Sequence, residues 1–210
     1  MAKTTCKKFT YAKYSAGGDG SAAISYTGGV MLDDYLAKVD INEERTDEKE
    51  YADGHLIDSE KIPTAVSMVM ELVNNSDAIK KDVLGLTEVG SSSSAELVLG
   101  ENDPPFVGAG CLMANRHKGT ITWEGYWIYK IQFTLNGVSA ETRRDRTSWQ
   151  HETISGDGVL VEPAVGGTKC FYAHKTGMTE SAAETWLKSH AGISGRGKTG
   201  RGAESPAPAF

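Results

Sequence analysis

Residues 120–135, TITWEGYWIYKIQFTL, carry the clearest structural signal in the chain. The odd-numbered positions are almost wholly apolar and the even-numbered ones mostly polar, and the side chains of a strand alternate between two faces. Together with its β-branched and aromatic residues, this alternation predicts a half-buried β-strand. The segment is far longer than the usual strand of about 5–6 residues. We therefore expect either a bend or bulge near Gly125 or a strand that continues past its own domain.

The composition allows a modest hydrophobic core. The chain of 210 residues fits one domain or at most two. Leu, Ile, Val and Phe make up just under a fifth of it, near the lower edge for a globular protein, and the net charge of −6 is too small to imply wholesale disorder. We expect long polar loops around a thin core. That core is either completed by self-association or belongs to a loop-rich monomer, and composition does not separate the two.

The N-terminus and the cysteines give no sign of export. Residues 1–8, MAKTTCKK, lack the apolar stretch of a secretory signal, and no run of about 18 apolar residues exists that could anchor the chain in a membrane. Cys6, Cys111 and Cys170 are widely spaced and form no Cys-x-x-Cys pair. We interpret them as free structural thiols in a reducing compartment.

The N-terminal part has a weaker pattern. Residues 1–20 carry four lysines and three aromatic residues and end in the Gly-rich SAGGDG. This composition predicts a short strand or a solvated arm that precedes a β domain of residues 21–191. Residues 30–41, VMLDDYLAKVDI, fit helical and strand spacing, so periodicity leaves both open there.

An acidic segment follows. Residues 43–60 contain eight acidic and two basic side chains, so their net charge of −6 equals that of the whole chain. Like charges repel, which predicts a mobile loop in the isolated protein. Loops longer than about 12–15 residues are uncommon unless functional, so residues 43–61 are either a solvated hairpin tip or a contact loop that orders against a partner. The candidate contact residues are Glu43, Glu44, Asp47, Glu48, Glu50, Asp53, Asp58 and Glu60.

Two helices are predicted. Residues 62–73 alternate as a strand, and the capping residues 74–77 then start a helix of two or three turns that Gly85 ends. A second helix covers residues 178–192, with Thr179 as its cap. Its predicted buried stripe comprises Ala182, Ala183, Trp186, Leu187 and His190.

Further strands are expected between and after these helices. Residues 106–115 form a strand that pairs with residues 120–135 as a hairpin. Shorter strands are predicted over residues 147–155, 159–165 and 168–175. Residues 192–210 are rich in Gly, Ala and Pro, which predicts a flexible C-terminal tail.

No motif indicates catalysis, a metal or a cofactor. The five histidines are scattered without metal-ligand spacing, and no G-x-S-x-G elbow exists, although a triad assembled only in space stays open. GISGRGKT matches the phosphate-binding loop, but that loop needs a strand before it and a helix after it. Here a helix comes before it and GRGAESPAPAF after it. We interpret the motif residues Gly192, Gly197, Lys198 and Thr199 as a chance match, not a nucleotide site.

The order of these segments resembles the major tail (tail tube) proteins of long-tailed bacteriophages. The resemblance rests on KEYADGHLIDSEK, PTAVSMVMELVNNSDAIKKDVLGL, PPFVGAGCLM, GYWIYKIQFTL and ETRRDRTSWQHETISG, in that order, and covers residues 35–175. It implies a mainly β fold, a tail-tube-type sandwich or barrel with one flanking helix after the central strand and a C-terminal helix. It implies no enzyme activity and no cofactor.

The resemblance also implies a function and partners. Six copies would form a ring, rings would stack into a tube, and the tube would join other phage tail proteins in the virion after assembly in the host cytoplasm. DNA would pass through without specific binding, because an acidic lumen repels phosphates. By analogy, the acidic segment would contact neighbouring rings. Its partners would be Arg143, Arg144 and Arg146, which otherwise fit a nucleic-acid patch only weakly.

An alternative reading is a β-sandwich binding module for carbohydrate or a host surface. Trp123, Trp127 or Trp149 would then stack on the ligand. Core packing is the commoner fate of tryptophans at strand spacing.

Overall fold

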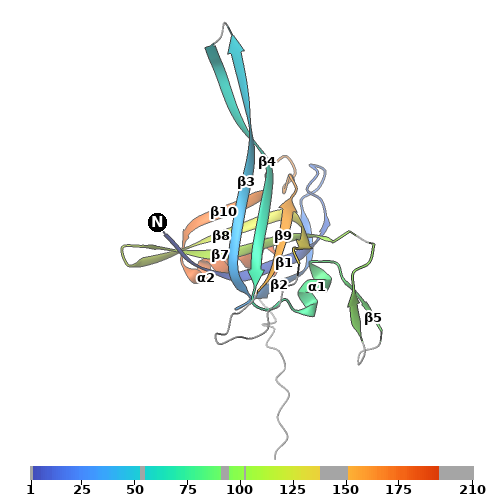
Figure 1. Ribbon diagram of the computed structural model, residues 1–210. Coiled ribbons are helices and arrows are strands. Elements are labelled where there is room, and N and C mark those ends of the chain that lie inside the picture. The colour runs from blue at the N-terminus through green and yellow to red at the C-terminus, as the bar shows by residue number, and fades with distance from the viewer. Residues whose placement is uncertain (1, 53–54, 91–94, 102, 138–150, 194–210) are drawn as a thin grey trace, which may run out of the picture.

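The fold is mainly β, as the sequence predicts. The computed structural model describes residues 2–52, 55–90, 95–101, 103–137 and 151–193. Its main sheet has eight strands in the order β2-β1-β7-β8-β9-β4-β3, with β10 paired to β8, and a separate two-stranded sheet pairs β5 with β6. Figure 1 shows two helices beside this sheet, α1 after β4 and α2 after β10. The elements are β1 (Ala2–Ala16), β2 (Ser25–Leu32), β3 (Leu36–Ala52), β4 (His55–Leu72), α1 (Asp77–Asp82), β5 (Thr87–Val89), β6 (Glu96–Val98), β7 (Phe106–His117), β8 (Thr120–Leu135), β9 (Glu152–Gly158), β10 (Tyr172–Met178) and α2 (Glu180–His190).

Strand β8 is the centre of the sheet. It forms the predicted hairpin with β7 along one edge, and its other edge pairs with β10 near its start and with β9 near its end. An irregularity does occur near Gly125, in the partner strand: the register of β10 shifts between Lys175 and Met178, opposite Gly125 and Trp123. A second irregularity lies in β8 itself. The register with β7 shifts between Val107–Ala109 and Ile128–Ile131, so Tyr129 and Lys130 together oppose Gly108.

This bulge changes which side chains of β8 face which core. Before it, the odd residues Trp123 and Trp127 pack in a cluster beneath α2. After it, the odd residues Ile131 and Phe133 pack in the larger cluster on the opposite face. An extra residue in a strand exchanges the two faces, because the side-chain period is two. The strand is therefore buried on both sides along part of its length, and the exposed polar face predicted from alternation is absent there.

Strand β1 overturns the expectation of an N-terminal arm. It pairs with β7 from Ala2 to Lys13 and with β2 from Phe9 to Ala16, so it lies inside the sheet. Phe9 and Tyr11 are fully or almost fully buried in the larger cluster. The lysines of this segment suggest an exposed arm, but the aromatic residues between them supply the core contacts that hold the strand in place.

The strands β3 and β4 settle two further expectations. Residues 30–41 continue β2 and begin β3, so the strand alternative is correct and the helical one is wrong. Residues 43–52 and 55–61 are paired strands, not a loop: β3 and β4 pair antiparallel from Leu36↔Leu72 to Ala52↔His55. The two strands pair through their backbones despite the like charges of their side chains. The described part of the acidic segment is therefore a hairpin.

The two helices agree with the sequence in place and differ in detail. Helix α1 has six residues, shorter than the two or three turns predicted, and it buries Ile79 against the larger cluster. In α2 the side chain of Thr179 caps the helix by accepting from the backbone N–H of Ala182. Ala183 and Leu187 are buried as predicted, whereas Ala182 is exposed.

The strand prediction after β9 is partly wrong. Residues 159–165 form no strand, and only isolated bridges occur there, Val161 with Cys170 and Glu162 with Asp19. The last strand, β10, begins at Tyr172, later than the predicted start of 168. The strand predicted at residues 147–155 lies partly outside the described residues, which exclude 147–150. Its remaining part overlaps with the first residues of β9, which starts at Glu152.

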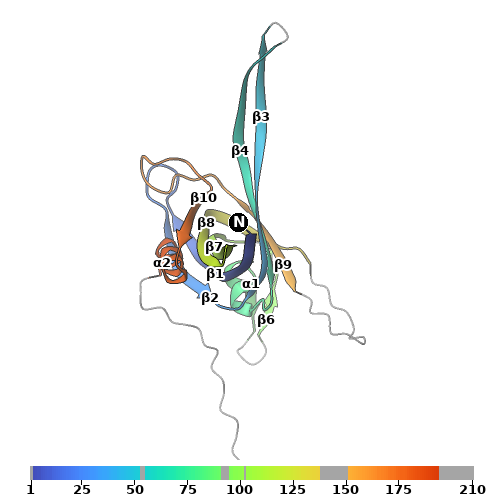
Figure 2. The ribbon, with the colours of Figure 1, turned by 90° about the vertical axis from the view of Figure 1, so that its left-hand side faces the viewer.

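The sheet curls so that its last strand returns toward β1. The sulfur of Cys6 in β1 lies 3.7 Å from the backbone oxygen of Ala37 in β3. Figure 2 shows the strands wrapped around a core, with α2 outside and the β3–β4 hairpin standing away from the body. The result is a barrel-like body, its interior filled by the larger cluster and its outer face covered by α2.

Candidate assembly surface

The outer part of the β3–β4 hairpin is exposed at nearly every residue whose side chain the structure describes. We call residues 45–52 and 55–63 the acidic ribbon. The β3–β4 register shifts between Glu44 and Arg45 of β3, whose partners in β4 are Ala65 and Pro63. The pairing of β4 with β9 starts only at Val66. Beyond this bulge the two strands pair only with each other among the described residues (Figure 1). Both outer edges of the ribbon therefore present free backbone groups.

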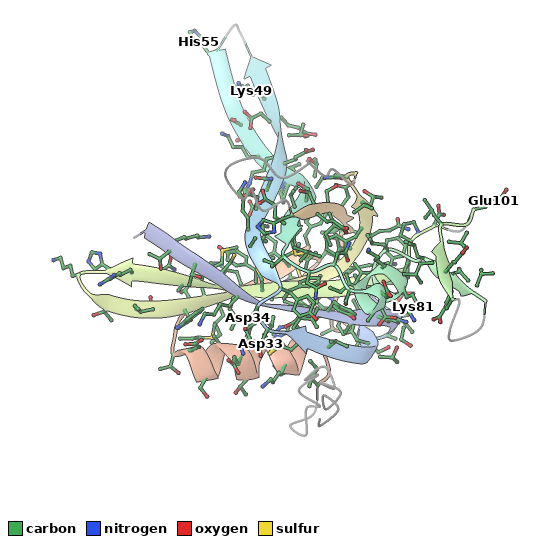
Figure 3. All side chains as sticks on the ribbon, turned by 60° about the horizontal axis from the view of Figure 1, so that its bottom comes forward. Asp33, Asp34, Lys49, His55, Lys81 and Glu101 are labelled. Carbon is green, nitrogen blue, oxygen red and sulfur yellow. The ribbon has the colours of Figure 1, made fainter. Side chains whose placement is uncertain are left out.

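The register places like charges opposite each other in the ribbon. Glu48 lies opposite Glu60, and Asp58 follows two residues before Glu60 on the same strand. Like charges directly opposite on one face of a sheet are destabilising. On the other face Lys61 lies 3.8 Å from Asp47, so that face is mixed in charge. Figure 3 shows Lys49 and His55 near the outer end, far from the body.

The foot of the ribbon is fixed to the body by Glu43. The Tyr172 hydroxyl, from β10, donates a hydrogen bond to this carboxylate, and the guanidinium of Arg45 lies 2.7 Å from it. The hydrogen bond from Tyr172, and then that from Arg45, lower the pKa of Glu43. The same hydrogen bond to Glu43 and partial burial raise the pKa of Tyr172 to about 12. Glu43 therefore stays ionised and anchors the ribbon where it leaves the barrel.

A buried carboxylate lies farther along the same side of the barrel. Glu124 of β8 is only 5% exposed. One of its oxygens lies 3.1 Å from Lys3 Nζ of β1, and the other lies 3.1 Å from His174 Nε2 of β10. The His174 ring stacks on Tyr126 at 4.1 Å between centroids. Burial alone would raise the pKa of Glu124, but the hydrogen bonds from Lys3 and His174 outweigh burial and lower it. This cluster joins three strands that are distant in sequence.

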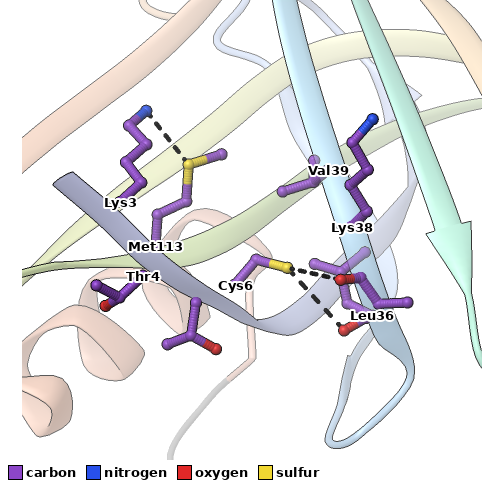
Figure 4. A pocket seen from close by; sticks show the side chains of 9 residues that line it. Lys3, Thr4, Cys6, Leu36, Lys38, Val39 and Met113 are labelled. Carbon is purple, nitrogen blue, oxygen red and sulfur yellow. Dashed lines mark hydrogen bonds between the residues drawn. The ribbon is translucent and has the colours of Figure 1, made fainter.

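A shallow hollow lies between β1 and β3. It has a volume of about 310 Å³ and is lined by Lys3, Cys6, Lys38 and Met113 among others (Figure 4). Both lysines are already engaged, Lys3 with Glu124 and Lys38 with Asp40. Among the described residues, no three His, Cys, Asp or Glu side chains come together as a metal site would need. The hollow therefore offers no converging set of free polar groups.

The structure places part of the residue set predicted from sequence. Glu44, Asp47, Glu48, Asp58 and Glu60 lie exposed on the hairpin, Glu43 lies at its foot, and Glu50 lies in β3. Asp53, Arg143, Arg144 and Arg146 fall outside the described residues, so the pairing of acidic segment and arginines is untested. Of the phosphate-loop match, Gly192 follows α2 with φ 67°, and Gly197, Lys198 and Thr199 also fall outside the described part.

Three further expectations from the sequence concern the tryptophans, a membrane span and the cysteines. Trp123 and Trp127 are buried in the cluster beneath α2, so neither is free to stack on a ligand, and Trp149 lies outside the described residues. No helix in the described part of the chain is both long and apolar enough to cross a membrane. Cys6, Cys111 and Cys170 are free thiols, and burial raises the pKa of Cys111.

Comparison with known proteins adds no identification. No protein-family model matches the chain, and no curated protein matches it.

Proposed function

We propose that this chain is a structural subunit that assembles with its own copies into stacked hexameric rings, forming a tail tube of the kind found in long-tailed bacteriophages. The observation that carries the proposal is the acidic ribbon. It is a paired β-hairpin that leaves the body; among the described residues it adds no side chain to either core cluster and leaves two strand edges free. Such edges pair readily with another chain.

The physical case for a partner is that the ribbon is poorly stabilised alone. A two-stranded hairpin is marginal in water without further packing, and this one sets Glu48 against Glu60. A partner that covers a free edge or brings positive charge supplies what the isolated chain lacks. In a ring, each copy would have such a partner. Exposed ion pairs contribute only about 0–1 kcal/mol each, so backbone pairing and apolar burial must provide most of the assembly free energy.

The proposed product is a conduit. A tube wall of net negative subunits would repel phosphates, which dominate nucleic-acid affinity, so DNA would pass without binding. The chain would then function in the virion alongside other tail proteins after assembly in the host cytoplasm. The proposal assigns no catalytic residue and no cofactor.

Negative-stain electron microscopy of the purified, concentrated protein tests the proposal. We expect rings or tubes of uniform diameter. Protein that stays monomeric at every concentration and salt condition would contradict it.

A second test addresses the partner expected from the sequence. If Arg143, Arg144 and Arg146 pair with the acidic segment, as the sequence suggests, their reversal to Glu should block tube growth while the monomer keeps its circular dichroism spectrum. Normal tubes from this variant would reject the arginine pairing and leave the tube function standing.

A further inference from the structure

A second hairpin projects from the body and carries the opposite charge. The β7–β8 hairpin extends past its neighbours and turns at Lys118 and Gly119, both with positive φ. We call residues 116–121 the basic tip. Arg116, His117 and Lys118 are all exposed there, and no carboxylate among the described residues lies within ion-pair distance of Arg116 or Lys118. The tip thus holds uncompensated positive charge.

The tip also has the other features that the acidic ribbon needs in a partner. Ile121, the register partner of Arg116, is 55% exposed. On the ribbon, Ile62 is 38% exposed and lies two residues from Glu60, with the same strand orientation. The basic tip and the Glu48–Glu60 face of the ribbon therefore each combine an exposed isoleucine with charges of one sign. In addition, β10 pairs with β8 only from Trp123 onward, so residues 120–122 leave a strand edge free among the described residues.

The two hairpins do not meet within one chain. They leave the body in different directions in Figures 1 and 3, and none of the ion pairs of the described residues joins them. A contact between them requires two copies. It would be heterologous, because each copy gives a ribbon to one neighbour and a tip to another, and heterologous contacts build rings or filaments and not closed two-fold dimers.

We infer that the basic tip of one copy receives the acidic ribbon of the next, with Arg116 and Lys118 facing Glu48 and Glu60 and with Ile121 near Ile62. This inference rests on the proposed self-assembly and names the surface that accepts the ribbon. The charges steer encounter and set register, since complementary charge acts mainly on specificity and association rate. The isoleucines and free edges add burial and backbone pairing.

Charge exchange tests the pairing. One variant reverses the ribbon (Glu48→Lys, Glu60→Lys) and another reverses the tip (Arg116→Glu, Lys118→Glu). In sedimentation velocity at low salt, we expect each alone to need at least about tenfold more protein for half-maximal association than wild type, because like charges then face each other. An equimolar mixture of the two should recover association, since each variant supplies the partner that the other lacks. A single chain carrying all four reversals should recover it as well.

The matched control reverses Lys169 and Lys175, which are exposed and make no ion pair among the described residues. It should associate like wild type. Circular dichroism melts confirm that each variant is folded.

The outcomes separate the two proposals. If wild type forms tubes and both single reversals also form them at wild-type concentrations, or if mixing restores nothing, the ribbon-to-tip contact is wrong and the tube function stands. If wild type forms only open oligomers whose association follows the charge exchange, the contact stands and the tube function is wrong. Wild type that never associates overturns both.

Discussion

At the scale of single residues, Glu124 shows how the fold joins distant strands. It is the only acidic side chain buried in the described part of the chain, and it is held by Lys3 and His174 from two other strands. Its pKa is lowered in the folded state from an ordinary 4.5. The contacts of its carboxylate with Lys3 and His174 therefore stabilise the protein fully above that ordinary value, and the contribution is lost as pH falls through the lower folded pKa.

We predict that Glu124→Gln lowers the free energy of unfolding by about 1–3 kcal/mol at neutral pH, since buried partners lose a charged acceptor. The difference from wild type should shrink as pH falls below about 4.5, where the unfolded carboxyl becomes protonated. Urea unfolding followed by circular dichroism at several pH values measures it. Glu96→Gln, at an exposed residue of β6, should have no effect. A stability difference between wild type and Glu124→Gln that grows toward acid pH would contradict the lowered pKa of Glu124.

Gly125 matters for its lack of a side chain. A Cβ there would lie 2.5 and 2.6 Å from two ring carbons of Trp186, so α2 packs directly on the β8 backbone. Gly125→Ala should cost about 1–3 kcal/mol of stability through overpacking. In a Trp186→Ala background the same substitution should cost much less, because the clashing ring is gone. Equal costs in the two backgrounds, measured by urea titration, would show that the contact is not responsible.

At the scale of elements, the two helices begin with different capping. The Thr179 hydroxyl oxygen lies 3.3 Å from the N–H of Ala182, whereas Ser76 makes no side-chain cap hydrogen bond at α1. We predict that Thr179→Ala costs about 1 kcal/mol of stability and that Thr179→Ser restores most of it. Ser76→Ala is the comparison and should cost only a few tenths. Chemical denaturation resolves these differences, and equal losses at both caps would contradict the geometry.

At the scale of the whole molecule, body and acidic ribbon are separable. None of the ribbon side chains that the structure describes belongs to either core cluster, so removing the outer part of the ribbon should leave the body folded. We predict that replacing residues 47–61 by Asn-Gly, which closes a tight hairpin between the register partners Thr46 and Ile62, changes body stability by less than about 0.5 kcal/mol. The shortened chain should form no rings or tubes by electron microscopy.

Two results would contradict that prediction in different ways. Normal tubes from the shortened chain would show that the ribbon is dispensable for assembly. An unfolded product would show that the ribbon is needed by the body. The full-length chain, purified and concentrated in parallel, is the control for both.

Local patterns in the sequence determined much of this protein. Alternation predicts β8, the capping residues place both helices, and the mainly β class follows from them, because these properties depend on side chains a few residues apart. The acidic character of the candidate surface is likewise visible in composition. These features need no knowledge of which strand lies beside which.

Only the tertiary structure decided register and neighbours. The bulge at Tyr129 and Lys130, the place of β1 inside the sheet and the opposition of Glu48 to Glu60 all depend on long-range pairing. So does the meeting of Lys3, Glu124 and His174. A one-residue shift in pairing exchanges the faces of a strand without changing its local pattern. The sequence therefore specifies the strands, and the packing of the whole chain selects their partners.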